Sequence, residues 1–441
     1  MDNDEHCEFQ LMVSNASDQK TLRFVRTVVE HLELPIPVSL WNGDVLGGGD
    51  DFDAQKTLHV HVASPQAVRT VARHPSLDSL VELWSSKQVD LINGTIFDVA
   101  AMNKPSGLKA KLKTLPKWAL AKDLPSLLMG DRNYDAASNL SGDNAHVSGS
   151  SKSAIQHHYD VSNGFYKLFL DDAMLYTCAY FKDWDNTLEQ AQFDKLDHIC
   201  KKLRLKPGDR LLDIGCGWGA MLIHATKHYG ATGHGVSLSQ EQTELARQRI
   251  EEEGLSDKIT IEIKSYTELD QRFDKISSIG MFEHVGIENY DTYFSSVARL
   301  LEPGGIYLHH AITRRNKKGK RFRKKSKEHK ALVKYIFPGG ELDHIGMSLS
   351  NLEAHGFEVH DVENLREHYG RTCRIWATRL WDRFDEAIAE VGEPKARLWF
   401  LYMAGCALAF ERGAVQINQT VATRRKRNKN VMPQTRDDLY N

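Results

Sequence analysis

The sequence predicts an α/β protein built on a doubly wound sheet, and two observations support that fold class. Between residues 155 and 312, short apolar segments of strand length alternate with longer segments of helix length, which is typical of parallel strands joined by helices. The first of these strands runs into Leu-Leu-Asp-Ile-Gly-Cys-Gly-Trp-Gly at residues 211–219. Glycines in such a turn let backbone N–H groups approach a bound ligand, and ligands of open α/β sheets bind at this edge.

The expected elements follow the chain in order. Strands are predicted over 210–214, 233–237, 259–263, 276–279 and 305–312, and helices over 220–228, 240–253 and 290–301. From residue 331 the sequence becomes largely helical and rich in aromatic residues, so it predicts either a cover for the sheet or a roof over an apolar cleft. The longest apolar run, Leu398–Phe410, is shorter than the about twenty residues that span a bilayer. It therefore predicts a buried helix.

A chain of 441 residues is long for one hydrophobic core, so two domains are expected. We place a smaller α+β accessory domain at 1–129, a linker at 130–153 and the main domain at 154–441. The linker is rich in Ser, Asn and Gly. From Gln10 to Pro116, the first domain alternates short apolar runs with polar turns. Within it, Thr57–Ala63 has strand periodicity and 67–99 is expected to be mostly helical.

The bulk composition is close to neutral, with a formal net charge of −2, and nothing in it calls for nucleic acid. The six cysteines form neither a CxxC pair nor a zinc-site spacing, which favours a reducing compartment over a disulfide framework. The acidic N-terminus lacks the basic and apolar regions of a signal peptide. A cytoplasmic protein is therefore expected, with at most peripheral contact to a membrane.

The glycine turn also narrows the ligand class. Its spacing is GxGxG rather than the GxGxxG of a dinucleotide site, and the second predicted strand ends on Ser237 instead of an acidic residue. These features favour S-adenosylmethionine over NAD. A plain tight turn without a ligand is the alternative.

Five separated segments carry a resemblance. They are His-Tyr-Asp-Val-Ser-Asn at 158–163, Leu-Tyr-Thr-Cys-Ala-Tyr-Phe at 175–181, the glycine turn, Phe-Glu-His-Val-Gly at 282–286 and Lys-Tyr-Ile-Phe-Pro-Gly-Gly at 334–340. Together, over 155–419, they closely resemble the cyclopropane fatty acid synthase family, which includes the mycolic acid cyclopropane synthases. The resemblance implies a Rossmann-like class I methyltransferase that moves a methylene or methyl group from S-adenosylmethionine to the cis double bond of a lipid acyl chain.

The resemblance also implies which residues bind the cofactor. The glycine turn lies under the methionine part, Tyr176 and Thr177 match residues near its carboxylate, and Ser237 and Gln242 match the residues that take the ribose hydroxyls. The adenine lies beside Tyr266 and Thr267, although Ser265 stands where the family often has Asp. The full expected set is Tyr176, Thr177, Asp213, Gly215, Gly217, Trp218, Ser237, Gln242, Tyr266 and Thr267.

A bicarbonate ion acts as the base in this family, and its cage matches Cys178, Glu283, His310, the backbone of Ile312, and Tyr369. The adjacent His309 leaves the register of His310 open by one residue. Alkylation of an alkene produces a carbocation, which needs negative charge and aromatic faces nearby. Tyr180, Phe181 and Tyr335 are candidate walls.

Each cage residue also has a purely structural interpretation. Cys178 and Tyr369 can be ordinary core residues, His310 can be a satisfied core histidine, and Glu283 can cap the helix expected near Asn289. Cys406 matches a cysteine of the acyl tunnel in mycolate relatives, and plain helix packing is the favoured interpretation for it.

A basic segment lies next to the expected site. Residues 314–330 contain eleven Lys or Arg and a single acidic residue, Glu328. A solvated loop is the ordinary interpretation, and docking on anionic phospholipid headgroups at the inner face of the membrane is the functional one. A second basic run lies at 424–429.

The predicted function is cyclopropanation of unsaturated phospholipid acyl chains, with 331–415 forming the helical acyl-binding region. Three alternatives remain open: a methyl- or methylene-branched product from the same first step, methylation of N or O on a small molecule, and a catalytically silent S-adenosylmethionine-binding regulator. An acyl-binding accessory or a homodimer-forming unit is the expectation for the N-terminal domain.

Overall fold

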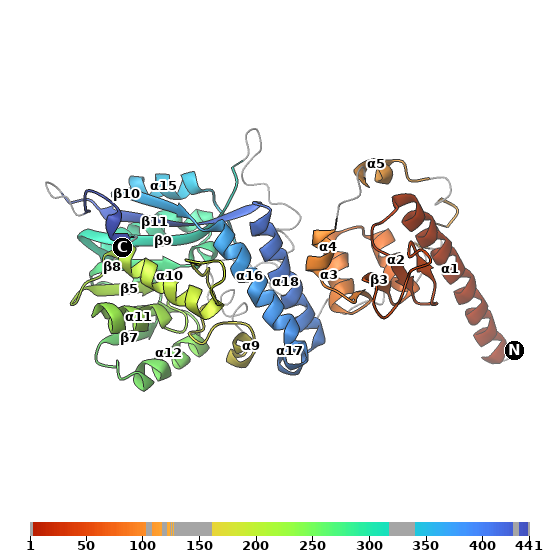
Figure 1. The fold of residues 1–441 in the computed structure, drawn as a ribbon, viewed down its shortest axis with the longest axis horizontal. Coiled ribbons are helices and arrows are strands. Elements are labelled where there is room, and N and C mark those ends of the chain that lie inside the picture. Colours follow the sequence, from red (N-terminus) through yellow and green to blue (C-terminus); the bar gives the residue numbers. More distant parts are fainter. Residues whose placement is uncertain are drawn as a thin grey trace. The chain divides into compact units, whose positions relative to one another are not determined.

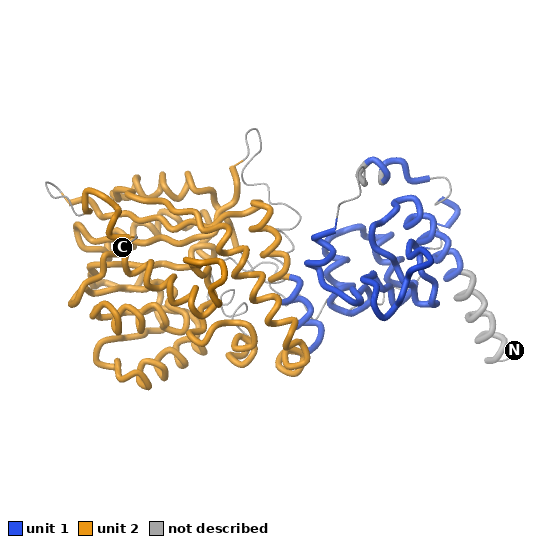
Figure 2. The backbone as a smooth tube through the Cα atoms, in the orientation of Figure 1, with its two compact units in different colours: residues 1–142, 392–401 blue, residues 143–391, 402–441 orange. Residues whose placement is uncertain are grey.

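The structure is a computed structural model, and it describes residues 3–102, 108–116, 121–123, 125, 127, 161–316, 340–426 and 432–439, with only the helical backbone at 3–16, 108, 109 and 112. The chain divides into two compact units (Figure 2). Unit 1 comprises residues 1–142 and 392–401, and unit 2 comprises 143–391 and 402–441. The linker expected at 130–153 lies outside the described residues.

Unit 2 is built on a seven-stranded sheet with the order β10-β11-β9-β8-β5-β6-β7 (Figure 1). Its strands are β5 (Arg210–Ile214), β6 (Thr232–Ser237), β7 (Ile259–Ile263), β8 (Phe273–Ile279), β9 (Leu301–Arg314), β10 (Phe357–Asn364) and β11 (Val415–Arg424). The strands from β5 to β9 pair in parallel, whereas β10 and β11 are antiparallel additions. The winding reverses between β5 and β8, which is where an open α/β sheet binds its ligand.

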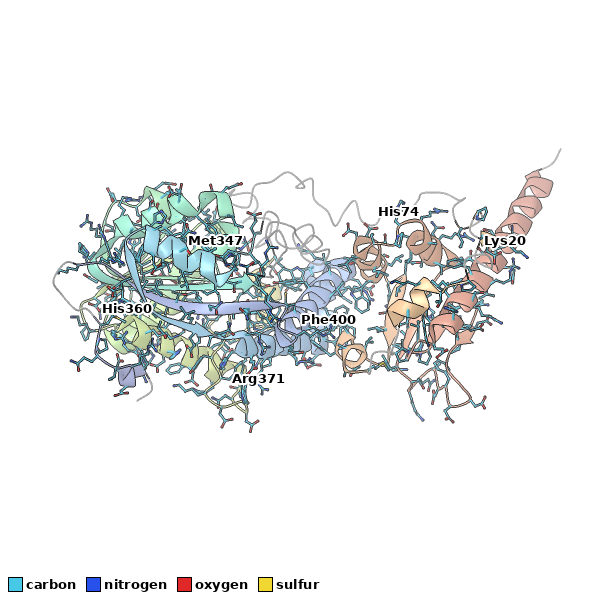
Figure 3. The ribbon with its side chains drawn as sticks, turned by 90° about the horizontal axis from the view of Figure 1, so that it is seen from above. Lys20, His74, Met347, His360, Arg371 and Phe400 are labelled. Carbon is cyan, nitrogen blue, oxygen red and sulfur yellow. The ribbon has the colours of Figure 1, made fainter. Side chains whose placement is uncertain are left out.

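Helices cover both faces of this sheet. One core cluster joins α10 (Leu188–Leu203), α11 (Ala220–Tyr229) and α12 (Gln240–Glu252) to one face. The other joins α13 (Tyr290–Leu300) and α15 (Ile345–Ala354), where Met347 packs against the cluster (Figure 3). Neighbouring strand residues such as Leu211 and Leu212 therefore point into different clusters, as the pleat requires.

The remaining elements of unit 2 are α9 (Asn163–Lys167), α16 (Arg366–Asp382), α17 (Phe384–Val391), α18 (Glu393–Glu411), and the short 3-10 helices η2 (Tyr266–Glu268), η3 (Phe282–His284), η4 (Ile287–Asn289) and η5 (Asp437–Leu439). The buried helix expected at Leu398–Phe410 is confirmed as part of α18, whose first residues group with unit 1. Within the described residues, no helix is both long and apolar enough to cross a membrane.

The predicted strands and helices between 210 and 301 are confirmed to within a few residues. The expectation that the chain is largely helical after residue 331 is wrong for β10 and β11. Polar residues dominate β11, and Asn418, Gln419 and Thr420 are buried because the strand lies between β9 and β10. Such a strand has no apolar alternation to reveal it.

Unit 1 contains a four-stranded sheet with the order β2-β1-β3-β4, flanked by helices. Its elements are α1 (Asn3–Leu32), β1 (Val38–Leu40), β2 (Val45–Leu46), β3 (His59–Val62), α2 (Pro65–Arg73), α3 (Leu77–Ser85), β4 (Val89–Ile92), α4 (Ile96–Ala101) and α5 (Leu108–Lys113). The mixed α+β character agrees with the expectation. Two details do not: α1 replaces the expected short runs and turns, and β4 interrupts the stretch expected to be helical, because a short apolar run suits either state.

A buried charge pair lies inside unit 1. Arg397, at the start of α18, donates from Nη2 to Asp90 Oδ1 at 2.7 Å and stacks its guanidinium 4.2 Å from the centroid of the Trp84 ring. Phe400, labelled in Figure 3, stacks on the same tryptophan. Helix α18 thus contributes its first turns to the core of unit 1.

Candidate active site

A cavity of about 340 Å³ opens at the carboxyl ends of the parallel strands of unit 2. All ten predicted cofactor residues line it: Tyr176, Thr177, Asp213, Gly215, Gly217, Trp218, Ser237, Gln242, Tyr266 and Thr267. They come from the ends of β5, β6 and β7 and from the loop before α10. The parallel strands end at one edge, so residues that are far apart in the sequence meet there.

The glycine turn after β5 has the backbone that only glycine adopts easily. Gly215 has φ +79°, and a Cβ built there would lie 2.8 Å from Met281 Cγ. The turn is tied to the neighbouring strand, since the N–H groups of Gly215 and Cys216 both donate to the Val236 carbonyl. Gly219, also at positive φ, begins α11. Positive φ costs an ordinary residue about 1–2 kcal/mol, so the turn selects glycine.

The polar groups after β6 and β7 are paired before any ligand binds. Ser237 Oγ and Gln242 Oε1 are 3.4 Å apart and both residues are buried. Ser265 Oγ and Thr267 Oγ1 are 2.7 Å apart at the start of η2. Burial raises the pKa of Tyr266 to about 12, so its phenol stays neutral beside the cavity. The serine at 265 therefore caps the turn locally.

At the β5 end, Asp213 is buried and accepts a hydrogen bond from Ser277 Oγ at 2.7 Å. Burial raises its pKa to about 6. Trp218 is held by a hydrogen bond from its Nε1 to Asn163 Oδ1. The Tyr176 ring packs 5.1 Å from Trp376, centroid to centroid, so an aromatic wall adjoins the glycine turn.

Two side chains of α10 hold the loop that carries Tyr176 and Thr177, and the sequence reasoning missed both. Gln192 Nε2 donates to the carbonyls of Leu175 and Thr177 at 3.1 and 3.0 Å, and Lys195 Nζ donates to Thr177 Oγ1 at 2.9 Å. Both residues are fully buried. Polar residues three positions apart in the apolar stripe of a helix were the available signal.

Glu283 and Ile312, two members of the predicted cage, are in direct contact. Glu283 Oε1 accepts a hydrogen bond from the Ile312 backbone N–H at 2.6 Å. Its other oxygen, Oε2, is buried without a hydrogen-bond partner among the described residues. Burial raises the pKa of this carboxyl to about 7. The interpretation of Glu283 as a cap for α13 finds no support, because Oε1 accepts from Ile312 and Oε2 has no hydrogen-bond partner among the described residues.

His310 and His309 point to opposite faces of β9. His309 lies with its ring 4.5 Å from Phe282 and its Nδ1 2.9 Å from the Tyr307 hydroxyl, among the residues of α13. His310 instead pairs its Nδ1 with Gln419 Nε2 at 3.2 Å, and its Nε2 is buried without a partner among the described residues. Burial, reinforced by Lys195 and Lys202, lowers the pKa of His310, so the imidazole is neutral.

Cys178 and Tyr369 form a second group. The Cys178 thiol is fully buried and donates to the carbonyl oxygens of Ala179 and Leu365. Burial raises its pKa, so the thiol is protonated and unsuited to nucleophilic attack. Burial raises the pKa of Tyr369 also, with further contributions from Cys373, Tyr176 and Cys178. These four residues are therefore neighbours.

None of the five predicted cage residues lines the cofactor cavity as far as the structure describes the chain. Contacts instead join them into two groups, Glu283 with Ile312 and Cys178 with Tyr369, while His310 is paired with Gln419. Of the candidate aromatic walls, Tyr180 stacks between His198 and His368. The guanidinium carbon of Arg371, which Figure 3 labels, lies 5.3 Å from the centroid of the Phe181 ring. Tyr335, residues 317–330 of the basic segment and residues 158–160 of the His158 motif lie outside the described residues.

Comparison with known proteins extends these observations. Residues 146–420 match the family described as mycolic acid cyclopropane synthetase. A "Probable fatty acid methyltransferase" of Pseudomonas putida is 37% identical over 415 residues, which is 93% of this chain and 98% of that protein. The "Cyclopropane-fatty-acyl-phospholipid synthase" of Escherichia coli K12 is 40% identical over 272 residues, which is 60% of this chain and 66% of that protein.

Among solved structures, mycolic acid cyclopropane synthase CmaA1 complexed with SAH and CTAB is 35% identical. It aligns with a TM-score of 0.58 and covers 62% of this chain and 98% of that one. The family match at residues 146–420 covers most of unit 2.

Proposed function

Because the chain belongs to the mycolic acid cyclopropane synthetase family and is an S-adenosylmethionine-dependent methyltransferase, we propose that it cyclopropanates unsaturated phospholipid acyl chains. Two buried polar atoms, Glu283 Oε2 and His310 Nε2, have no hydrogen-bond partner in the part of the chain that the structure describes, and this observation carries the proposal. Unpartnered polar atoms inside a protein are costly, and they suit a small oxyanion that supplies the missing hydrogen bonds.

The residues present fit a bicarbonate ion. Neutral His310 can donate from Nε2 when Gln419 fixes the ring, and Glu283, with a pKa of about 7, can carry the proton that it would share with an oxyanion. The neutral phenol of Tyr369 is a further donor, whereas the thiol proton of Cys178 is directed at the carbonyl oxygens of Ala179 and Leu365. When bound, bicarbonate would supply a base for the final proton.

The chemistry proceeds by attack of the alkene π electrons on the methyl carbon of the sulfonium. The new C–C bond forms as the S–C bond breaks, which leaves S-adenosylhomocysteine and a carbocation on the acyl chain. The Glu283 carboxyl, which shares a proton with the oxyanion, provides partial negative charge for that cation, and the aromatic side chains Tyr176, Tyr369 and Trp376, of which Trp376 is buried, limit the access of water. Loss of a proton from the added methyl group then closes the ring.

The test is incubation of the protein with labelled S-adenosylmethionine and vesicles of a monounsaturated phospholipid, followed by mass spectrometry and proton NMR of the lipids. A product heavier by one methylene with ring protons upfield of ordinary methylenes supports the proposal. Label found on a polar small molecule, or no labelled lipid from protein that binds the cofactor, rejects it.

A branched product is the second candidate, and the Pseudomonas putida relative, named a probable fatty acid methyltransferase, favours it. It shares the alkylation step, after which a hydride shift and proton loss leave a methyl or methylene branch. The same NMR experiment separates the two, because a branched chain has no upfield ring signals.

Access to the acyl chains is proposed to occur at an anionic membrane surface through the basic segment 314–330. Its charge density supports headgroup binding, each charge near the surface contributing about 1 kcal/mol. Replacing Lys317, Lys318, Lys320, Arg321, Arg323, Lys324 and Lys325 with neutral residues should abolish the preference for anionic over neutral vesicles and keep affinity for S-adenosylmethionine. Unchanged vesicle binding would discard this mode of access.

For unit 1 we propose an acyl-binding or dimer-forming role. Light scattering of the full chain, with and without phospholipid, tests the dimer directly.

A further inference from the structure

Lys195 is a fully buried lysine whose side chain lines the cofactor cavity. It lies in the middle of α10 and reaches the loop that carries Thr177. Burying an ammonium group costs free energy unless an anion or several hydrogen-bond acceptors contact it. Its surroundings therefore indicate what it is placed to bind.

The protein itself provides only part of the hydrogen bonding and opposite charge that would stabilise this ammonium group. The ammonium has three protons, and Nζ donates to Thr177 Oγ1 at 2.9 Å. No carboxylate among the described residues forms an ion pair with it. The carboxylates that it senses are already engaged: Asp213 by Ser277, and Asp171 by the N–H groups of Ala173 and Leu175. Burial accordingly lowers the pKa of Lys195 to about 8.

The position of Lys195 within the cavity separates it from the nucleoside end. Ser237 and Gln242 follow β6 and Tyr266 follows β7, the side of the sheet where the ribose and adenine of such a cofactor lie. Lys195 interacts instead with groups of β5, Asp213, and of β9, His310. An extended cofactor that has its nucleoside at β6 and β7 directs its amino-acid end toward Lys195.

The other lysine that lines the cavity is Lys264, which follows β7, is partly exposed and forms an ion pair with Glu262. Lys195 is thus the buried cation at the amino-acid end of the described cavity. We propose that the Lys195 ammonium is the counter-ion of the α-carboxylate of S-adenosylmethionine, with the Thr177 hydroxyl as the second donor to the same carboxylate. The inference rests on the cofactor site and is independent of which lipid product forms.

The experiment compares two ligands on three proteins by calorimetry. The ligands are S-adenosylhomocysteine and its decarboxylated analogue, and the proteins are the wild type, Lys195→Met and Lys195→Gln. The wild type should prefer the carboxylate-bearing ligand by about tenfold or more, as expected for a charge-assisted hydrogen bond in a buried site. Both variants should lose most of that preference, while affinity for the decarboxylated analogue changes little.

The control is Lys202→Met, which removes another fully buried lysine from the same helix. Lys202 is paired with Glu363 and Gln419 and lies outside the cavity. That variant loses stability but should keep the ligand preference. Lys195→Gln can still donate to Thr177, so loss of preference there reports the charge and not the position of the loop.

Two outcomes overturn the inference. One is a wild type that binds both ligands equally well, a result that needs no variant to fold. The other is a Lys195→Met protein that keeps the ligand preference and instead needs more bicarbonate for turnover. That result would mean that the ammonium helps to bind bicarbonate and not the cofactor carboxylate. Failure to cyclopropanate phospholipid, in contrast, would bear on the proposed function alone, because the test measures cofactor binding.

Discussion

The cofactor cavity and the cage differ in how their polar groups are satisfied. In the cavity, Ser237 is paired with Gln242, Asp213 with Ser277, and Thr177 with Lys195. In the cage, Glu283 Oε2 and His310 Nε2 are buried without partners among the described residues. The cavity is thus largely preorganised, whereas the cage lacks hydrogen bonds that an additional group must provide.

This difference predicts which changes affect binding and which affect turnover. Residues of the cavity hold one another in place, so their replacement should weaken the binding of the cofactor. Residues of the cage have protein partners for only some of their polar atoms, so their replacement should slow the reaction while the cofactor stays bound. The following predictions test that separation.

Glu283→Gln should have the largest effect. The amide keeps the shape of the side chain but removes the negative charge next to the carbocation, so turnover should fall by about a hundredfold or more. Affinity for S-adenosylhomocysteine should stay within about twofold of the wild type, because Glu283 does not line the cavity. Initial rates of label transfer and calorimetry measure the two quantities. A large loss of cofactor affinity would show that Glu283 also contributes to cofactor binding. The cavity and the cage would then not be functionally separate.

The pH dependence of stability should report the same carboxyl. Between its ordinary pKa of 4.5 and its folded pKa of about 7, the folded state keeps a proton that the unfolded chain releases, so rising pH destabilises the fold across that window. Above pH 7 the loss is complete, and it amounts to about 3 kcal/mol.

Denaturant unfolding of the wild type and Glu283→Gln in bicarbonate-free buffer at pH 5 and pH 8 measures this term. The variant should lose less stability than the wild type between the two pH values. Parallel curves would mean that the carboxyl is solvated in the folded protein.

Two glycines of the turn allow a matched comparison inside the cavity. Gly215→Ala combines positive φ with a Cβ 2.8 Å from Met281 Cγ, whereas a Cβ at Gly217, also at positive φ, meets nothing within 4 Å. Gly215→Ala should therefore weaken the binding of S-adenosylhomocysteine by about tenfold, and Gly217→Ala should weaken it less. Calorimetry and thermal unfolding of both variants provide the measurement, and equal effects would argue against the steric explanation.

Gln419→Leu should have the smallest effect. It removes the partner of His310 Nδ1, so the imidazole loses its fixed orientation and turnover should fall by a few-fold to about tenfold. Cofactor affinity should not change. Steady-state rates at saturating cofactor, with calorimetry alongside, would reveal an effect on binding if the separation is wrong.

All ten residues predicted to bind the cofactor line one cavity, whereas the five predicted cage residues fall into separate groups, and this difference has a physical reason. Gly215, Gly217, Ser237 and Tyr266 follow strands whose apolar pattern is legible, and parallel strands end at one edge. The register of His310 could not be read from His-His alone, because it depends on which face of β9 carries α10. Alternation from Ile306 and Leu308 on that face now assigns His310 to it.

Other features escaped the sequence because tertiary context decides them. Gln419 belongs to a polar strand that is buried only because β10 covers the far side of β11. Lys195 resembles any helix lysine until the fold shows that it is buried and lines the cavity. The five cysteines whose side chains are described are free thiols.

The first turns of α18 set a practical limit on dissecting this protein. Arg397 is buried against Asp90 and Trp84, which belong to the first 142 residues. An expression boundary drawn at residue 143 would strip the guanidinium of its carboxylate, a change that typically costs about 3–5 kcal/mol when a buried pair loses one member. A shortened enzyme would therefore need Arg397 and its aromatic neighbours redesigned as a surface before its activity could be compared with that of the whole chain.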